Sequence, residues 1–297
     1  MIYNNWMKYI KDDVKLVDLI MPSAHNAGSY GLPLIACCQD GTIYEQFMYG
    51  VRHFCVRIDT NRKGEPHSCH SISMGVKLEE IMQDYKRVLE ESDDFFIIDL
   101  REYYPIDLLI TQIKFKSNKQ RVDELVAEYL SPEKYAFTEF EDINDVTMGD
   151  IRASGKRYIL LNYRKEYEYS VDVPHIFPWK KSMYGSTPKN FSKKCLSLLD
   201  TTPKEGLFWF QTQQTPNIGT LMGLTPPRYF DNMDRPYFPQ IIKDIETVPS
   251  RLAKANIIAG DFMTRDYMKA KLILELNVKK GNVKEELIEE YLKGLEA

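Results

Sequence analysis

The chain has 297 residues, 43% of them hydrophobic and 28% charged, a composition close to the globular average that allows a large buried core. Its formal net charge is −4 and its pI is about 5.8. A mildly acidic chain of this kind excludes broad nucleic-acid binding and a strongly cationic surface for membranes. We therefore expect no nucleic-acid partner.

The cysteines and the apolar segments indicate the cellular compartment of the protein. The five cysteines are odd in number and match no zinc template, so we expect reduced thiols. The N-terminus lacks the pattern of a signal peptide, and no window approaches the roughly 18 apolar residues of a membrane-spanning helix. We expect a protein that is cytoplasmic, or peripherally associated with a cytosol-facing membrane, and that has no transmembrane segment.

Short apolar runs alternate with longer amphipathic stretches along the chain. The first run, residues 16–21, leads through Pro22, Ser23 and Ala24 into His25. Residues 78–89 place apolar side chains three and four apart, which predicts a helix, and residues 122–130 are similar. The remaining predicted strands are residues 54–58, 95–100, 157–162, 207–211 and 256–262.

The alternation of strands and helices predicts βα units, a parallel sheet and an α/β fold. Residues 239–255 are expected to be helical with an interruption at Pro249, and residues 179–206 are expected to be irregular. The charged tail at 284–297 is expected to form an amphipathic helix packed on the outside. We predict one domain across residues 1–297 and a monomer.

Polar side chains that do not suit a core follow several of these apolar strands. In a parallel barrel the carboxyl ends of the strands share one rim, where active sites are assembled. Several polar residues at equivalent strand ends therefore predict a site at that rim. They are His25, Asn26, Arg57, Asp59, His70, Asp99, Arg101 and Asp261.

Six segments in order resemble the strand ends of the phosphatidylinositol-specific phospholipase C catalytic domain, over about residues 15–265. The loops that carry AHNAG and TQQTPN are most similar to metal-independent bacterial members and to protozoan members that cleave glycosylphosphatidylinositol. The resemblance implies a distorted TIM-type (β/α) barrel and an inositol phospholipid at a membrane surface as the partner. The six segments are PSAHNAGSYGL, GVRHFCVRID, HSCH, FFIIDLREYY, FQTQQTPN and NIIAGDFM.

The resemblance implies a role for each matching residue. His25 corresponds to the base that takes the proton from the inositol 2-hydroxyl, and His70 to the acid that protonates the leaving diacylglycerol oxygen. Two imidazoles with pKa values near neutrality suit both proton transfers. Arg57 corresponds to the arginine that neutralises phosphoryl charge. Asp261 corresponds to the carboxylate that holds the base in its working tautomer.

We expect substrate contacts from Asn26, Asp99, Arg101 and Arg164. Arg101 lies where the family often has a basic residue near the inositol ring.

The sequence departs from the family at several of these positions. Asn26 replaces the aspartate that supports the acid in bacterial members, so another group, such as the Asn26 amide oxygen, has to orient His70. Calcium-dependent members also have asparagine here, but two of their carboxylate positions are Cys55 and Arg57 in this chain. An arginine repels Ca²⁺, so we expect no metal and no cofactor.

The second histidine is not followed by the usual glycine, and His67 competes with His70 for the acid role. The distance to the helix that begins at Leu78 favours His70. His53 and His175 match no motif, and we interpret them as structural.

Two other functions remain open from the sequence. A glycerophosphodiester phosphodiesterase is also a barrel, but it needs a Glu-x-Asp metal pair near Cys55 and Arg57, which is absent. A catalytically degenerate barrel that binds inositol phosphates or a protein partner is supported by Asn26 and by the missing glycine. His25, Arg57 and Asp261 argue against it.

Overall fold

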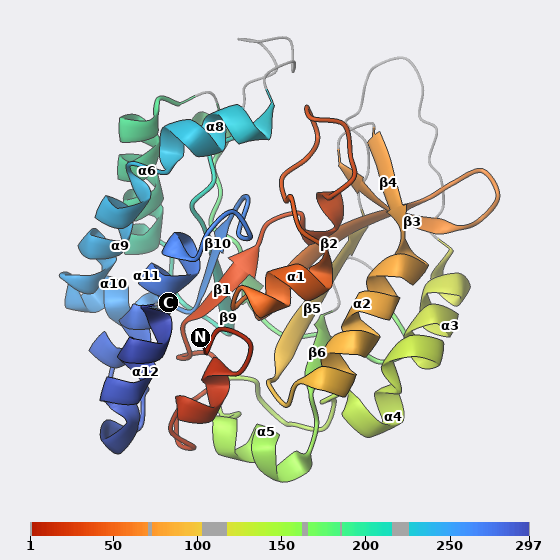
Figure 1. Cartoon of the computed structure of the whole chain (residues 1–297), viewed down its shortest axis with the longest axis horizontal. Coiled ribbons are helices and arrows are strands. Elements are labelled where there is room, and N and C mark those ends of the chain that lie inside the picture. Colours follow the sequence, from red (N-terminus) through yellow and green to blue (C-terminus); the bar gives the residue numbers. More distant parts are fainter. Residues whose placement is uncertain are drawn as a thin grey trace.

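The computed structural model describes residues 2–70, 73–102, 118–161, 166–184, 186–215 and 226–296. Its strands lie in the middle of the molecule and its helices lie around them (Figure 1). The strands are β1 (Met21–Ala24), β2 (His53–Thr60), β3 (Pro66–His70), β4 (Ser73–Lys77), β5 (Phe96–Glu102), β6 (Tyr158–Leu161), β7 (Ser170–Val171), β8 (His175–Ile176), β9 (Leu207–Gln211) and β10 (Ile257–Gly260).

Eight of these strands form a curved parallel sheet in the order β7-β6-β5-β2-β1-β10-β9-β8. The register of β1 on β10 aligns Ala24 with Gly260, and the register of β2 on β5 aligns Arg57 with Arg101. The remaining strands, β3 and β4, form an antiparallel hairpin attached to the end of β2. The result is a distorted half-barrel of the TIM type, as the sequence predicted.

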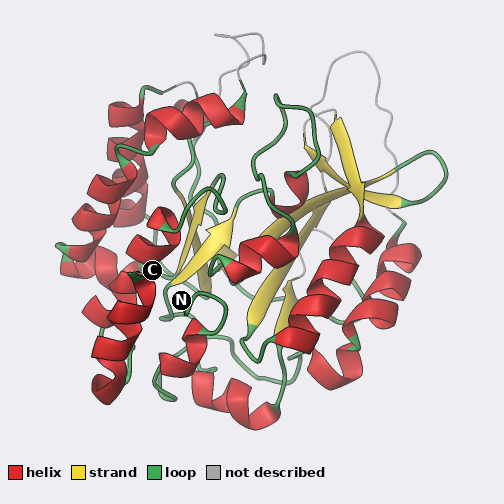
Figure 2. Cartoon of the chain, in the orientation of Figure 1, coloured by secondary structure: helices red, strands yellow, loops and turns green. Residues whose placement is uncertain are grey.

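Helices cover the outside of the sheet on two sides (Figure 2). One group, α2 to α4, lies beside β2 and β5, and a second group, α9 to α12, lies beside β1 and β10 (Figure 1). The helices are α1 (Ile43–Met48), α2 (Leu78–Glu91), α3 (Lys119–Leu130), α4 (Pro132–Tyr135), α5 (Met148–Ser154), α6 (Pro188–Thr201), α8 (Pro227–Asp234), α9 (Phe238–Glu246), α10 (Pro249–Lys254), α11 (Met268–Lys279) and α12 (Ile288–Leu295). Four short 3₁₀ segments complete the described structure, η1 (Trp6–Tyr9), η2 (Ala27–Ser29), η3 (Lys181–Met183) and η4 (Glu285–Leu287).

The helix α2 shows how the sequence pattern produces the packing. Its buried residues are the apolar residues spaced three and four apart. Tyr85 stacks on Phe96 of β5 with ring centroids 5.6 Å apart and meets Phe54 of β2 edge-on at 5.5 Å. These aromatic contacts fix the helix over the two strands that carry Arg57 and Arg101, so the position of both arginines depends on a rigid core.

The two ends of the chain pack together at the amino-terminal end of the barrel. The Tyr3 hydroxyl donates a hydrogen bond to the Leu295 carbonyl at 2.9 Å, and the Ile2 amide donates to the Gly294 carbonyl. Tyr291 of α12 is fully buried. The expected amphipathic tail helix therefore packs on the outside of the barrel, away from the carboxyl ends of the strands.

Three predicted elements differ from the structure. Residues 16–20 are not a strand, because the parallel ladder with β10 begins at Met21. The segment around His67 and His70, expected to be a loop, is instead the strand β3. It pairs antiparallel with both β2 and β4. The segment expected to be irregular contains α6, which begins with a proline at its first turn and buries Phe191, Cys195 and Leu199.

No helix in the described part of the chain is long and apolar enough to cross a membrane.

Candidate active site

Four of the predicted site residues meet at the carboxyl ends of the strands. His25 directly follows β1, Asp261 directly follows β10, Arg57 lies near the end of β2, and His70 ends β3. His25 Nδ1 lies 2.8 Å from Asp261 Oδ1, and Arg57 Nη2 lies 3.4 Å from His25 Nε2. The rings of His25 and His70 are 6.4 Å apart at 85°. The parallel pairing of β1 with both β2 and β10 creates this arrangement.

The hydrogen bond to the Asp261 carboxylate fixes which ring nitrogen of His25 carries the proton. Asp261 can only accept, so Nδ1–H is the donor and Nε2 presents a bare lone pair toward Arg57. Burial lowers the pKa of His25, but the charge and the hydrogen bond of Asp261, with the contact to Cys38, outweigh it and raise the pKa. The His25 imidazole is therefore a stronger base than an ordinary histidine, with Nε2 as the basic atom.

His70 is held differently from the expectation that Asn26 orients it. Its Nδ1 lies 2.7 Å from the Ala36 carbonyl oxygen, which can only accept, so Nδ1 carries a proton. Nε2 is then the atom that can exchange a proton with a ligand. Burial and then the charge of Arg57 lower the pKa of His70 to about 4.

The two candidate acids, His67 and His70, differ in their surroundings. His67 Nδ1 lies 3.0 Å from the Gly75 carbonyl oxygen, and its Nε2 lies 3.1 Å from the Asn61 side-chain nitrogen. One ring nitrogen is therefore engaged by β4 and the other by the turn between β2 and β3. His70, in contrast, faces His25, so the geometry supports His70 as the partner of the base.

Asn26 and Cys38 form a link between the two histidines. Asn26 adopts a left-handed backbone conformation with φ of 47°, and its amide nitrogen donates to Cys38 Sγ at 3.5 Å. Cys38 Sγ in turn lies 3.7 Å from His70 Nδ1. Sequence analysis missed Cys38, because only the folded loop brings it to the histidines. Burial raises the pKa of the Cys38 thiol, which is therefore neutral.

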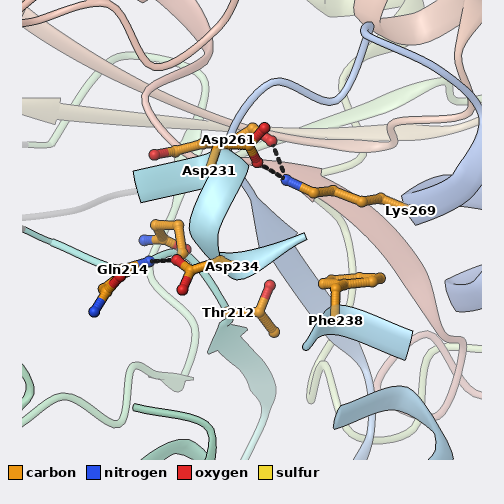
Figure 3. A pocket seen from close by; sticks show the side chains of 8 residues that line it. Thr212, Gln214, Asp231, Asp234, Phe238, Asp261 and Lys269 are labelled. Atoms are coloured by element: carbon orange, nitrogen blue, oxygen red, sulfur yellow. Dashed lines mark hydrogen bonds and ion pairs between the residues drawn. The ribbon is translucent and has the colours of Figure 1, made fainter. Parts of the chain in front are cut away.

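Behind Asp261 lies a buried charge network that the sequence did not reveal. Lys269 of α11 donates to the Asp261 carbonyl oxygen at 2.5 Å and to the carboxylate of Asp231 (Figure 3). The neighbouring cavity, also lined by Asp234, measures about 10 Å³. That volume suits about one water molecule and is far too small for an inositol ring. The network thus supports the Asp261 backbone.

The other expected substrate contacts lie deeper or elsewhere. Arg101 is adjacent to Arg57 across the β5–β2 ladder, so the two side chains share a face of the sheet. Its Nε and Nη2 lie 2.8 and 2.7 Å from Asp99 Oδ2, and its guanidinium carbon lies 4.3 Å from the Trp209 ring centroid. Asp99 itself is fully buried inside the barrel. Arg164 lies outside the described residues.

Among the residues that the structure describes, two groups of side chains have the composition of a metal site. In the first, His25, Cys38 and Asp261 place ligand atoms within 4.8 Å of one another. Asp261 already accepts from His25, and the buried thiol is neutral, so this group is poorly prepared for a cation. The second group, His53, Asp99 and His175, lies in the barrel interior. Burial lowers the pKa of His53 to about 3 and that of His175 to about 4.

The half-barrel has counterparts among solved structures. The phosphatidylinositol-specific phospholipase C from Listeria monocytogenes superposes with a TM-score of 0.66 at 16% identity, covering 93% of this chain and 98% of that one. A mutant of the Staphylococcus aureus enzyme gives 0.68 at 15% identity, covering 95% and 97%. This chain has the fold of these bacterial phospholipases.

A further structure of the Staphylococcus aureus phospholipase C comes from work on the modulation of its membrane binding; its TM-score is 0.67 at 16% identity. No protein-family model matches the chain, and no curated protein sequence matches it. At these identities the likeness concerns the fold, so the chemistry has to be argued from the side chains.

Proposed function

We propose that this protein is a metal-independent phosphodiesterase of the phospholipase C type that cleaves phosphatidylinositol or glycosylphosphatidylinositol lipids. The observation that supports this most is the pair of imidazoles at the strand ends, His25 and His70, 6.4 Å apart with Arg57 beside the first. Each ring is fixed through Nδ1 by an acceptor, so each presents Nε2 to a ligand.

In this proposal His25 is the general base and the inositol 2-hydroxyl is the nucleophile. His25 Nε2 takes the hydroxyl proton, and the alkoxide attacks the phosphorus to form a five-membered cyclic phosphate. The attack is intramolecular, so it gains effective molarity that a free water molecule lacks. Asp261 stabilises the imidazolium that forms, because its carboxylate accepts from Nδ1 at 2.8 Å.

His70 is the general acid of the same displacement. The P–O bond to diacylglycerol breaks as His70 Nε2–H delivers a proton to the leaving oxygen. Arg57 stabilises the charge on the phosphoryl oxygens. Because Arg57 also helps to lower the pKa of His70, a bound phosphodiester anion that offsets the arginine charge would raise that pKa toward the range of an effective acid.

Arg101, Asn26 and Arg164 are proposed to contact the inositol headgroup. Arg101 has the strongest structural support, since it is adjacent to Arg57 on the same face of the sheet. Asp99 is fully buried and holds Arg101 by its carboxylate, so we propose that it acts on the substrate through Arg101.

Exposed apolar side chains on the rim next to His70 support the proposal that the substrate lies in a membrane surface. Leu34 and Ile35 are 66% and 44% exposed, and they precede the residue whose carbonyl holds His70. Met74, 40% exposed, pairs with Cys69 on the β3–β4 hairpin beside it. Apolar side chains of this size on a rim suit contact with lipid. We propose that the protein acts peripherally, from the cytosolic side.

The deciding experiment assays the full chain on phosphatidylinositol and on a glycosylated analogue in EDTA, with phosphorus NMR of the products. We expect turnover in EDTA, inositol 1,2-cyclic phosphate as the first product, and loss of turnover in His25→Ala. A 2-O-methyl inositol substrate should bind without being cleaved.

Other outcomes point to the alternatives. Activity lost in EDTA and restored by a divalent cation would indicate a metal-dependent diesterase. Headgroup binding without any turnover would indicate a degenerate barrel. Efficient cleavage of the 2-O-methyl substrate would show direct attack by water and overturn the proposed mechanism.

A further inference from the structure

Inside the barrel, below Arg101 and apart from the four proposed catalytic residues, three side chains from three strands face one another. They are His53 at the start of β2, Asp99 in the middle of β5 and His175 at the start of β8. His53 Nε2 lies 3.8 Å from Asp99 Oδ2, and His175 Nδ1 lies 4.0 Å from the same oxygen. All three donor atoms lie within 4.8 Å of one another.

The two imidazoles lie against the Asp99 carboxylate without a hydrogen bond to it. A hydrogen bond between nitrogen and oxygen spans about 2.7–3.2 Å, so 3.8 and 4.0 Å are too long. His53 Nε2 and Asp99 Oδ1 are buried and make no hydrogen bond within the described structure. Each buried polar atom without a partner costs about 1–3 kcal/mol. The cluster therefore lacks a group that would satisfy several of its atoms together.

A small cation bound between the three residues would satisfy them. Zn²⁺ binds imidazole nitrogen and carboxylate oxygen at about 2.0–2.2 Å in tetrahedral geometry, which places ligand atoms about 3.4 Å apart. The two nitrogen–oxygen separations, 3.8 and 4.0 Å, are about 0.4 and 0.6 Å longer than this, so small side-chain rotations would bring these atoms to the spacing of bound ligands. Two imidazoles with one carboxylate select a transition metal rather than Ca²⁺ or Mg²⁺, which prefer oxygen ligands alone.

The surroundings of His53 and Asp99 resemble the outer shell of a metal site. His53 Nδ1 lies 2.8 Å from Ser23 Oγ, which also accepts from Trp209 Nε1 at 3.0 Å. A Nδ1–H donated to Ser23 leaves Nε2 as a bare ligand directed at Asp99. Arg101 engages Asp99 Oδ2, the oxygen to which both imidazole distances are measured, and so orients the carboxylate. Asp99 Oδ1 makes no hydrogen bond within the described structure, and a small rotation of the carboxylate would present it to a cation. Partners of this kind fix ligand orientation in metal sites.

We propose that His53, Asp99 and His175 form a structural binding site for a zinc-class transition metal ion. Within the sheet of the described residues, β8 is an end strand that pairs with β9, whereas β5 and β2 are the third and fourth strands from the other end. A metal ion would join them across the barrel interior and close the half-barrel. Arg101 reduces the attraction of Asp99 for a cation, so we expect micromolar rather than tighter affinity. The ion has no part in turnover.

The test uses the full chain, stripped with a chelator and titrated with Co²⁺, which reports tetrahedral coordination by its visible absorption. We expect one Co²⁺ per chain, displacement by Zn²⁺, and a rise in Tm of a few degrees at saturating Zn²⁺. X-ray absorption of the zinc form should show nitrogen and oxygen ligands without sulfur. These measurements use the unmodified chain, so they test the proposal even if a variant folds poorly.

Matched variants locate the ion. His175→Ala should weaken Co²⁺ binding by at least about tenfold, whereas His67→Ala and Cys38→Ser should bind as the unmodified chain does. The absence of Co²⁺ binding at 100 µM (about the weakest affinity compatible with the proposal) would overturn the inference. So would a zinc–sulfur distance or the loss of binding in Cys38→Ser, since either places the ion at His25, Cys38 and Asp261.

Discussion

The replacement Asp261→Asn tests the proposed mechanism most directly, because it removes one charge and keeps the shape. The asparagine oxygen can still accept from His25 Nδ1 at the 2.8 Å site. What disappears is the carboxylate that stabilises the buried imidazolium formed when His25 takes a proton. Leaving a buried charge without its partner costs about 3–5 kcal/mol. At 1.36 kcal/mol per factor of ten, kcat/KM should fall by about 10²–10⁴.

The pH profile of the same variant shows in which direction the pKa of His25 changes. A loss of activity alone does not show this. Burial alone lowers the pKa of His25, and Asp261 is the main cause that raises it. Without the carboxylate the pKa falls, so the rising limb of kcat/KM should move to lower pH while the maximum drops. The assay is initial-rate hydrolysis of phosphatidylinositol in mixed micelles between pH 5 and 9.

A matched control lies in the same pocket. Burial raises the pKa of Asp234 to about 7, so this carboxyl is partly protonated at neutral pH, and Asn mimics its protonated form. Asp234→Asn should therefore change kcat/KM by less than about tenfold. An Asp261→Asn enzyme within tenfold of the unmodified protein, or a rising limb displaced to higher pH, would refute the role given to Asp261.

Three further predictions concern the neighbouring residues. His70→Ala should lower kcat/KM by about 10²–10⁴, whereas His67→Ala should leave it within about threefold; equal losses would contradict the choice of acid. The pKa of His25 is raised in the folded state, so its pairing with Asp261 stabilises the fold most strongly below about pH 6.5. This stabilisation is lost as the pH rises through the raised pKa. The Tm difference between the unmodified chain and Asp261→Asn should therefore shrink from pH 6 to pH 9, and a constant difference would count against the pairing. Replacing Leu34 and Ile35 by Ser should reduce turnover on vesicles while leaving a soluble short-chain substrate unaffected, and an equal loss on both would argue against a lipid contact.

The sequence predicted the parallel strands well, because a strand buried on both faces needs an unbroken apolar run. β9 matches its predicted range, and β2 and β5 differ only by a residue or two at each end. The β3–β4 hairpin was missed, since its mixed polar residues pair through the backbone on a half-exposed edge. The helix α6 was missed as well, although Pro188 with apolar residues at Phe191 and Cys195 follows the helical spacing.

For the candidate site, the positions of polar residues along the strands and the family resemblance together predicted which residues would meet, although Asp99, also expected at the rim, is fully buried. His25 and Asp261 directly follow β1 and β10, Arg57 lies in the second half of the neighbouring β2, and the register brings the three together. What holds His70 was not predictable, because the Ala36 carbonyl belongs to a loop without a period or a motif. Lys269 was missed for another reason: it lies on a helix, where a lysine normally faces solvent, and only packing shows it buried against Asp231.

The environments of the two histidines push their pKa values apart, which is the pattern expected of an acid–base pair. Asp261 raises the pKa of His25, and burial with Arg57 lowers that of His70. Taken alone, a pKa of about 4 would leave His70 without the proton that an acid has to deliver at neutral pH. The assignment nevertheless follows from the charges that a phosphodiester brings. Its anion next to Arg57 cancels the largest charge effect on His70 and favours the imidazolium there. Asp261, on the far side of His25, keeps that ring in the tautomer whose Nε2 accepts a proton. In the proposed mechanism, Arg57 would therefore link substrate binding to the protonation of the acid, and its charge would do more than hold the phosphate.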